Sequence, residues 1–104
     1  RDVVEDGHCV KDRIVAVVLQ VDIFGNIVTS VPSRYAVVIY KGQVGKKTVQ
    51  KPVSCYTDMK EGELHFIEGS SGFMEISLRG DSAAIRTGAT RGSEVIAFLK
   101  GNRP

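Results

Sequence analysis

Apolar residues occur along this chain in short runs, several of which alternate with polar residues, and turn-forming residues separate the runs. Eleven glycines and three prolines punctuate the sequence. This spacing is typical of the short strands of an all-β barrel or sandwich. The strand-like runs are DRIVAVVLQV (12–21), NIVTSV (26–31), YAVVIY (35–40), KKTVQK (46–51), PVSCYT (52–57), ELHFIE (63–68), FMEISLR (73–79) and SEVIAFL (93–99).

The segment YKGQVGKK (40–47) lies between two of these runs and has the composition of a hairpin loop. Glycine adopts positive φ without steric cost, so Gly42 and Gly45 can both take turn conformations. We therefore expect the chain to reverse direction within this segment.

The segment DSAAIRTG (81–88) has the signals of one short helix. Asp81 or Ser82 can cap its first amides, and Gly88 can take the left-handed position after its last turn. With the strand-like runs, this segment predicts an all-β fold: a compact, mostly antiparallel β barrel with one short helix near residues 82–87.

Length and composition favour one domain spanning residues 1–104, since 104 residues with 42% hydrophobic content can bury a single core. No internal repeat or low-complexity segment suggests a second domain. Because the chain begins with Arg1 rather than methionine, we expect that a longer protein contains it.

The charges argue against nucleic acid and membrane partners. A net charge of +2, with 25% charged residues of both signs, gives no basic stripe. An OB-like nucleic-acid binder is disfavoured because no strand interleaves aromatic residues with Lys and Arg. No apolar run approaches the about 20 residues of a membrane-spanning helix. The first residues are too polar for a signal peptide, so we expect a cytoplasmic protein.

Cysteine and histidine give no metal-binding pattern. Cys9, Cys55, His8 and His65 lack the short spacings that place two ligands on one turn, so we predict no metal site. We expect Cys55 to be partly buried in a strand and His65 to be an exposed strand residue. Whether Cys9 and Cys55 are paired stays open.

The stretch VDIFGNIV (21–28) interrupts the most apolar part of the chain with an acid, a glycine and an amide. One interpretation is an Asx-type turn in which Asp22 and Asn26 hydrogen-bond the local backbone and Phe24 covers the end of the barrel. The other is a binding loop, because an acid, an aromatic face and an amide can hold an ammonium group, a planar ring and a base edge.

The stretch EGSSGFMEI (68–76) poses the same choice. It can be a glycine-flanked hairpin turn with two solvated serines. Alternatively, Gly69 and Gly72 let the backbone approach a ligand while hydroxyl and N–H groups bind a carboxylate or phosphate.

The order, spacing and flanks of these stretches resemble one family. The segments VDIFGNIVTSV (21–31), CYTDMKEGELHFIEGSSGFMEISLRGDSAA (55–84) and GSEVIAF (92–98) carry the resemblance. They are similar to the C-terminal domain of the S-adenosylmethionine (SAM) hydroxide adenosyltransferases. These SAM hydrolases form adenosine and methionine and are related to the fluorinating and chlorinating SAM enzymes. The resemblance extends over roughly residues 12 to 99.

The resemblance implies a two-domain enzyme, usually a trimer, in which an N-terminal α/β domain precedes a β-rich domain such as this one. SAM, the substrate, lies between the N-terminal domain of one subunit and the C-terminal domain of its neighbour. No cofactor is implied. The Gly-Ser-Ser-Gly run is closer to the hydrolase form than to the halogenases, but the sequence leaves open whether the nucleophile is water or a halide. The chain would then be the adenine- and methionine-binding half of an enzyme that cleaves SAM with water to adenosine and L-methionine.

At the methionine end of SAM, the resemblance assigns three residues. Asp22 would contact the ammonium group, and Ser70 and Ser71 would contact the rest of the amino-acid end.

At the adenine end, the resemblance implies that Asn26 reads the base edge and Phe24 lines the pocket. The backbone at Arg79 and Gly80 would read the rest of that edge, and Tyr56 is a candidate for stacking on the ring.

Three positions depart from the common family pattern: Ile23 replaces a basic residue, and Ser30 and Arg79 each replace an asparagine. The family activates water with an Asp, Arg and His set in its N-terminal domain, and nothing here matches that set. We therefore expect the chain to act within an enzyme but not to turn over SAM alone. The alternative is a stand-alone β-barrel interaction module that keeps the fold without catalysis.

Overall fold

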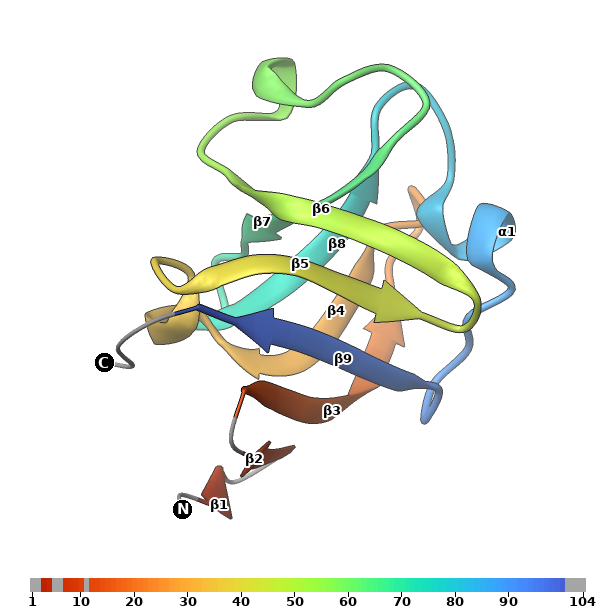
Figure 1. Cartoon of the computed structure of the whole chain (residues 1–104). Coiled ribbons are helices and arrows are strands. Elements are labelled where there is room, and N and C mark those ends of the chain that lie inside the picture. Colours follow the sequence, from red (N-terminus) through yellow and green to blue (C-terminus); the bar gives the residue numbers. More distant parts are fainter. Residues whose placement is uncertain (1–2, 5–6, 11, 101–104) are drawn as a thin grey trace.

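The computed structural model of the chain describes residues 3–4, 7–10 and 12–100, with side chains from residue 12 onward (Figure 1). The strands are β1 (Val3–Val4), β2 (Gly7–Val10), β3 (Arg13–Val21), β4 (Ile27–Pro32), β5 (Ile39–Val44), β6 (Lys47–Val53), β7 (Leu64–Glu68), β8 (Phe73–Leu78) and β9 (Glu94–Leu99). The helical elements are the 3₁₀ turns η1 (Ser33–Tyr35) and η2 (Tyr56–Asp58) and the α-helix α1 (Ala83–Thr87). Within the described residues, no helix is long and apolar enough to cross a membrane.

Seven strands close into a barrel, which confirms the predicted all-β fold with one short helix. The strand order is β3-β4-β8-β7-β6-β5-β9, and β9 pairs back onto β3. All of these pairings are antiparallel except the parallel pair β6–β7. The β1–β2 hairpin adds to the free side of β3, below the barrel in Figure 1.

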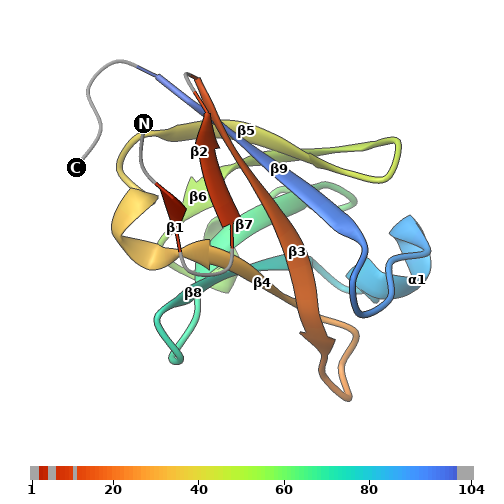
Figure 2. The same cartoon turned by 90° about the horizontal axis from the view of Figure 1, so that it is seen from below.

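Strand β3 closes the barrel because its two halves have different partners. Residues 13–17 pair with β9, and residues 18–21 pair with β4, with a register shift between Val18 and Gln20. A shift of this kind bends a strand and increases its twist. The chain therefore leaves β3 at the rim of the barrel, and the β3–β4 loop projects from it (Figure 2).

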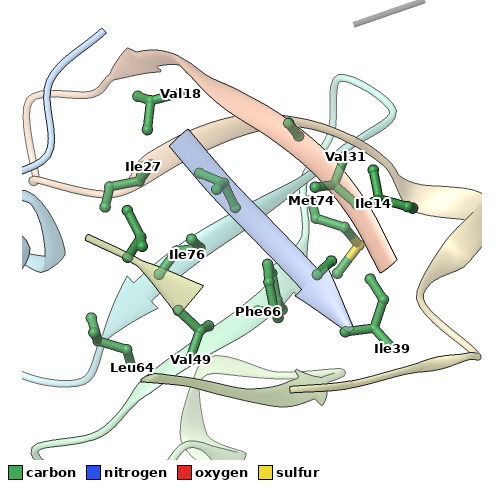
Figure 3. Close-up of a cluster of buried hydrophobic side chains, with 14 of the residues drawn as sticks. Ile14, Val18, Ile27, Val31, Ile39, Val49, Leu64, Phe66, Met74 and Ile76 are labelled. Atoms are coloured by element: carbon green, nitrogen blue, oxygen red, sulfur yellow. The ribbon is translucent and has the colours of Figure 1, made fainter. Parts of the chain in front are cut away.

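The core fills the barrel with side chains from every strand of the closed ring (Figure 3). Phe66 and Ile76, from neighbouring strands β7 and β8, are both fully buried. Gly42 on β5 lies against the Phe66 ring: a Cβ at this position would fall 2.5 Å from the ring and 2.5 Å from the Ile96 carbonyl. The absence of a side chain at Gly42 thus makes room for the Phe66 ring, the largest side chain that is fully buried.

Two buried hydroxyl residues on β4 occupy places where the strand ladders are interrupted. Thr29 donates to the Met74 carbonyl at 2.7 Å and accepts from the Val31 amide at 3.1 Å. Ser30 accepts a hydrogen bond from the Val17 amide at 3.0 Å. Both hydroxyls satisfy backbone groups that would otherwise be buried without a partner, so Ser30, one of the departures from the family pattern, has a structural role.

Of the run 35–40, which was predicted to be a strand, only Ile39 and Tyr40 lie in one. Two successive turn hydrogen bonds, Ala36 N–H to Ser33 O at 2.9 Å and Val38 N–H to Tyr35 O at 3.0 Å, carry the chain from β4 to β5. Strand β5 starts only at Ile39, because the chain must first cross the end of the barrel and bury Tyr35.

The predicted 40–47 loop is also wrong in length. Lys47 pairs directly with Val44, so only Gly45 and Lys46 form the turn, and of the two predicted glycines only Gly45 has positive φ, at 59°. A two-residue hairpin turn suits the right-handed twist of the flanking strands.

His65 and Cys55 differ from their predicted environments. His65 is buried at 6% exposure. Its Nδ1 lies 3.1 Å from the Lys51 carbonyl of the parallel strand β6, and its Nε2 accepts from the Lys60 N–H, between η2 and β7, at 3.5 Å. Cys55 is exposed with a free thiol and precedes η2 instead of lying in a strand. The side chains of Cys9 and His8 lie outside the described residues.

Replacing Gly42 with alanine should destabilise the barrel by overpacking. Gly42→Ala forces the Phe66 ring or the β9 backbone to move, and such insertions typically cost about 1–3 kcal/mol. Thr48→Ala, at an exposed position on the neighbouring strand β6, is the control and should change stability by less than about 0.5 kcal/mol. Urea unfolding of the two variants measures the difference. Equal stability of both variants would contradict the packing role of Gly42.

Candidate functional site

The β3–β4 loop is organised around the carboxylate of Asp22. Its Oδ1 accepts hydrogen bonds from the backbone N–H groups of Phe24 at 2.8 Å and Asn26 at 3.0 Å. The Asp22 N–H donates to the Asn26 carbonyl at 3.0 Å, which closes the loop. These contacts form the Asx-type turn that the sequence offered as one interpretation.

The Asp22 carboxylate also orients the side chain of Asn26. Asn26 Nδ2 donates to Asp22 Oδ2 at 3.1 Å, and among the described residues no group donates to Asn26 Oδ1. The Asp22 carboxylate therefore fixes the directions in which the Nδ2 donor and the Oδ1 acceptor of Asn26 point. An amide oriented in this way can pair with a complementary group on a ligand.

Hydrogen bonding keeps Asp22 ionised. Burial raises the pKa of this carboxyl, but the hydrogen bonds from Asn26 and from the Phe24 N–H outweigh that effect and hold the pKa below its usual value of 3.8. The loop thus carries a full negative charge at neutral pH.

Phe24 and Ile23 project into solvent from the same loop. Phe24 is 73% exposed and Ile23 93% exposed. The interpretation that Phe24 covers the end of the barrel is therefore wrong, although the Asx turn itself is confirmed. An exposed aromatic face beside a fixed amide and a carboxylate remains available for a ligand.

The β3–β4 loop packs against the start of α1, as Figure 1 shows at the right of the barrel. Gly25, with φ of 84°, approaches so closely that a Cβ there would overlap the Ser82 hydroxyl and lie 2.6 Å from its Cβ. The Gly25 carbonyl accepts from the Ala84 amide at 2.9 Å. Ser82, which precedes α1, is thereby held next to the loop.

Tyr56, Arg79 and Gly80 form a second group of predicted residues. The Gly80 N–H donates to the Tyr56 hydroxyl. Arg79 Nη1 donates to the carbonyls of Met59 at 3.0 Å and Thr57 at 3.4 Å. The Arg79 side chain thus ties the β8–α1 segment to η2.

Ser70 and Ser71 lie in the β7–β8 turn, whose closing bond runs from the Gly69 N–H to the Phe73 carbonyl at 3.0 Å. Both serines are exposed. Figure 2 shows this turn and the β3–β4 loop projecting from the same side of the barrel, at separate places along it. No hydrogen bond among the described residues joins either serine to Asp22.

Glu75 lies between these two loops and was not singled out from the sequence. It pairs with Val28 on β4 and Ile67 on β7, and a Cβ at Gly69 would fall 2.9 Å from its Cγ and Cδ. Burial, and secondly the charge of Asp22, raise the pKa of the Glu75 carboxyl above its usual 4.5. Only the strand register brings it near both loops, so sequence spacing gave no signal for it.

A cavity of about 300 Å³ lies elsewhere, between the β5–β6 turn, the end of α1 and the start of β9. Its lining, which runs from Gln43 to Gly45, from Thr87 to Ala89 and along Ser93, Glu94 and Ile96, includes none of the predicted site residues. Those residues are exposed or half-buried on the loops at the rim instead. Such a surface encloses a ligand only when something covers it.

Removing the two carboxylate charges should change stability in opposite directions. Because the folded pKa of Asp22 is lowered, its charge stabilises the fold above about pH 4, and this contribution is lost as pH falls. The raised pKa of Glu75 means that its charge opposes folding as pH rises past 4.5. At pH 7, Asp22→Asn should therefore lower and Glu75→Gln should raise the urea midpoint, and both differences should shrink at pH 3. Shifts of the same sign at pH 7 would refute this assignment.

Solved structures share this fold. An uncharacterized conserved protein from Thermotoga maritima superposes with a TM-score of 0.75 at 23% identity, over 90% of this chain and 39% of that chain. A conserved hypothetical protein from Thermus thermophilus gives a TM-score of 0.70 at 27% identity, over 81% of this chain and 34% of that chain. The chain thus spans little more than a third of either protein. Comparison with curated proteins gives no match.

The family comparison covers both loops of the candidate site. Residues 16–96 match the SAM hydroxide adenosyltransferase C-terminal domain. The match includes the β3–β4 loop, the β7–β8 turn and the segment before α1, together with nearly all of the closed barrel. The chain therefore belongs to the family of SAM hydroxide adenosyltransferase C-terminal domains.

Proposed function

We propose that this chain is the adenine- and methionine-binding part of a hydrolase that cleaves SAM with water to adenosine and L-methionine. Family membership links the chain to SAM chemistry. The observation that carries the finer proposal is the β3–β4 loop, where an ionised carboxylate, a fixed amide and an exposed aromatic ring lie within five residues.

Asp22 is suited to the methionine ammonium group. Its carboxylate accepts protein hydrogen bonds on both oxygens, and a carboxylate has about four lone-pair directions, so a direction remains for a cation. The lowered pKa keeps this group charged, which favours an ammonium ligand. The exposed hydroxyls of Ser70 and Ser71 are available for the carboxylate end of the same ligand.

Asn26 and the segment at Gly80 are suited to the adenine edge. The Asn26 amide offers its free Oδ1 to the exocyclic amino group, while Phe24 provides an apolar wall. The packing of Gly25 on Ser82 joins this loop to the end of the segment that leads from Gly80 to α1. Tyr56 contacts the same segment and can flank the base with its ring.

The reaction itself needs groups beyond this chain. The water oxygen attacks C5′ of SAM while the C5′–S bond breaks. The electron pair of that bond stays on sulfur, which becomes the neutral thioether of methionine, and the water loses one proton. In-line attack requires the water to be held opposite the sulfur. We propose that an N-terminal α/β domain outside this chain holds the water. This is consistent with the chain spanning 39% and 34% of the two solved relatives.

The exposed apolar side chains support a site completed by another protein surface. Ile23, Phe24 and Ile85 are 93%, 73% and 83% exposed, and they lie on the loop and helix that pack together. Surfaces of this kind commonly mark contacts with a partner or ligand. In a trimer, the neighbouring subunit's α/β domain would cover them.

Asn26→Ala should weaken adenosine binding by about 1–3 kcal/mol, because it leaves groups on the base edge unpaired. Calorimetry on the protein that contains this chain measures the change, and Thr48→Ala, an exposed change on β6 outside both loops, is the control. Asp22→Asn should weaken SAM more than adenosine, since only SAM carries the ammonium group.

The protein that contains this chain should convert SAM to adenosine and methionine. Chromatography of the products measures this conversion. Absence of both turnover and nucleoside binding would overturn the proposal and favour an interaction module that keeps the fold.

A further inference from the structure

The cavity of about 300 Å³ lies outside the candidate site, where the β5–β6 turn, the end of α1 and the start of β9 meet at the right of the barrel in Figure 1. Glycine stands on two of its walls. Gly45, in the turn, has φ of 59°, and Gly88, which ends α1, has φ of 74°. Neither wall fills the space with a side chain at these positions. An apolar cavity of about 150 Å³ is enough to hold a benzene ring, so this one has room for a side chain or a small ligand.

The lining uses most of its donors inside the chain. Three of its backbone N–H groups have partners: Gly88 donates to the Ala84 carbonyl at 2.8 Å, Ala89 to Thr87 Oγ1 at 3.1 Å, and Ser93 to the Thr90 carbonyl at 2.9 Å. The Thr87 hydroxyl donates to the Ala83 carbonyl at 2.9 Å, and Gln43 Nε2 donates to the Gly45 carbonyl at 3.0 Å. These donors are therefore largely occupied and do not suit an anionic ligand.

Two acceptors of the lining lack donors. The Thr87 carbonyl oxygen faces the turn, since it lies 3.7 Å from the position that a Cβ on Gly45 would take, and no described residue donates to it. The Glu94 carboxylate is exposed and has no hydrogen bond or ion pair with any residue from 12 to 100. Among the described residues that line the cavity, none is Lys, Arg or His. The cavity thus has a net negative charge and acceptors that a cation can satisfy.

The buried part of the lining is apolar. Val44 and Ala89 are buried, and Ile96 is half-buried. Apolar walls with acceptors beside them match a group that has a carbon chain as its stem and a cation at its end, as arginine and lysine have. The arginine guanidinium presents five N–H donors in a planar fork, so it can pair with a carboxylate through two of them and still donate to a carbonyl.

We propose that this cavity binds an arginine side chain presented by another protein, with the guanidinium on the Glu94 carboxylate and the Thr87 carbonyl and the carbon stem on the apolar walls. The occupant is a side chain and not a free amino acid, because an α-carboxylate would meet no cation in the lining. The cavity shares no residue with the β3–β4 loop or the β7–β8 turn. The inference and the proposed function can therefore fail independently.

The test titrates the 104-residue chain, whose closed barrel has its own core, and follows its backbone amides by NMR. The probe is Nα-acetyl-arginine N-methylamide, an arginine side chain whose backbone carries no charge. It should shift the amides of Gly45, Gly88 and Ser93 with millimolar affinity, as expected for so small a group, and leave Gly25 and Gly69 unmoved. The corresponding citrulline amide, a neutral urea of the same shape, should bind about fivefold more weakly.

Glu94→Gln should weaken binding of the arginine probe about fivefold, the upper end of the effect of one exposed charge pair, and added salt should weaken it in the unmodified chain. Glu61→Gln makes the same change at an exposed position outside the lining. It is the matched control and should leave the affinity unchanged. If Glu94→Gln does not fold, the citrulline comparison in the unmodified chain tests the same charge.

Three results would overturn the inference: no shift of the lining amides, equal affinity for the arginine and citrulline amides, or equal losses in Glu94→Gln and Glu61→Gln. Free L-arginine and agmatine should bind no more tightly than the blocked amide. Tighter binding of either would also overturn the inference, because the cavity would then select a small free cation and not a side chain of another protein.

Discussion

Closure of the barrel through β3 is the constraint on which the rest of the structure depends. One strand of nine residues pairs with β9 over its first half and with β4 over its second, so the sheet has no free edge within the closed ring. The bend between these halves directs the chain out at the rim. The β3–β4 loop, α1 and the β8–α1 segment meet there because β4 and β8 are neighbours in the same ring.

In the Asp22 carboxylate, the structural role and the proposed binding role rest on the same interactions. The hydrogen bonds that form the turn are the same interactions that lower its pKa and orient Asn26. A turn residue and a binding residue are therefore not alternatives at this position. The turn and the binding-loop interpretations differ mainly in the place of Phe24. Its ring is exposed and available to a ligand, and it does not cover the core.

The candidate site is an open rim and not an enclosed cavity. Its polar groups are arranged by short contacts within the chain, whereas its apolar side chains face water. Glu75 adds a second negative charge between the β3–β4 loop and the β7–β8 turn. A cationic ligand bridging this region would relieve the repulsion between two carboxylates, which is consistent with the ammonium and sulfonium groups of SAM.

The sequence by itself determined the elements whose signals are local. Period-two and β-branched runs located β3, β4, β7, β8 and β9, and the Ser82 cap with Gly88 located α1, because side-chain burial and capping act over a few residues. The family resemblance located both loops of the site. It did not locate Glu75, whose importance comes from strand register.

Tertiary structure alone decided the features that depend on contacts between distant segments. It made 35–38 a connection because Tyr35 is buried at the barrel end, and it kept Gly42 in a strand against Phe66. It also buried His65 between the Lys51 carbonyl and the Lys60 amide. It also brought the Tyr56 hydroxyl to the Gly80 amide, across 24 positions of sequence. No local pattern encodes such pairs, because packing and hydrogen bonding between separate strands exist only once the barrel has closed.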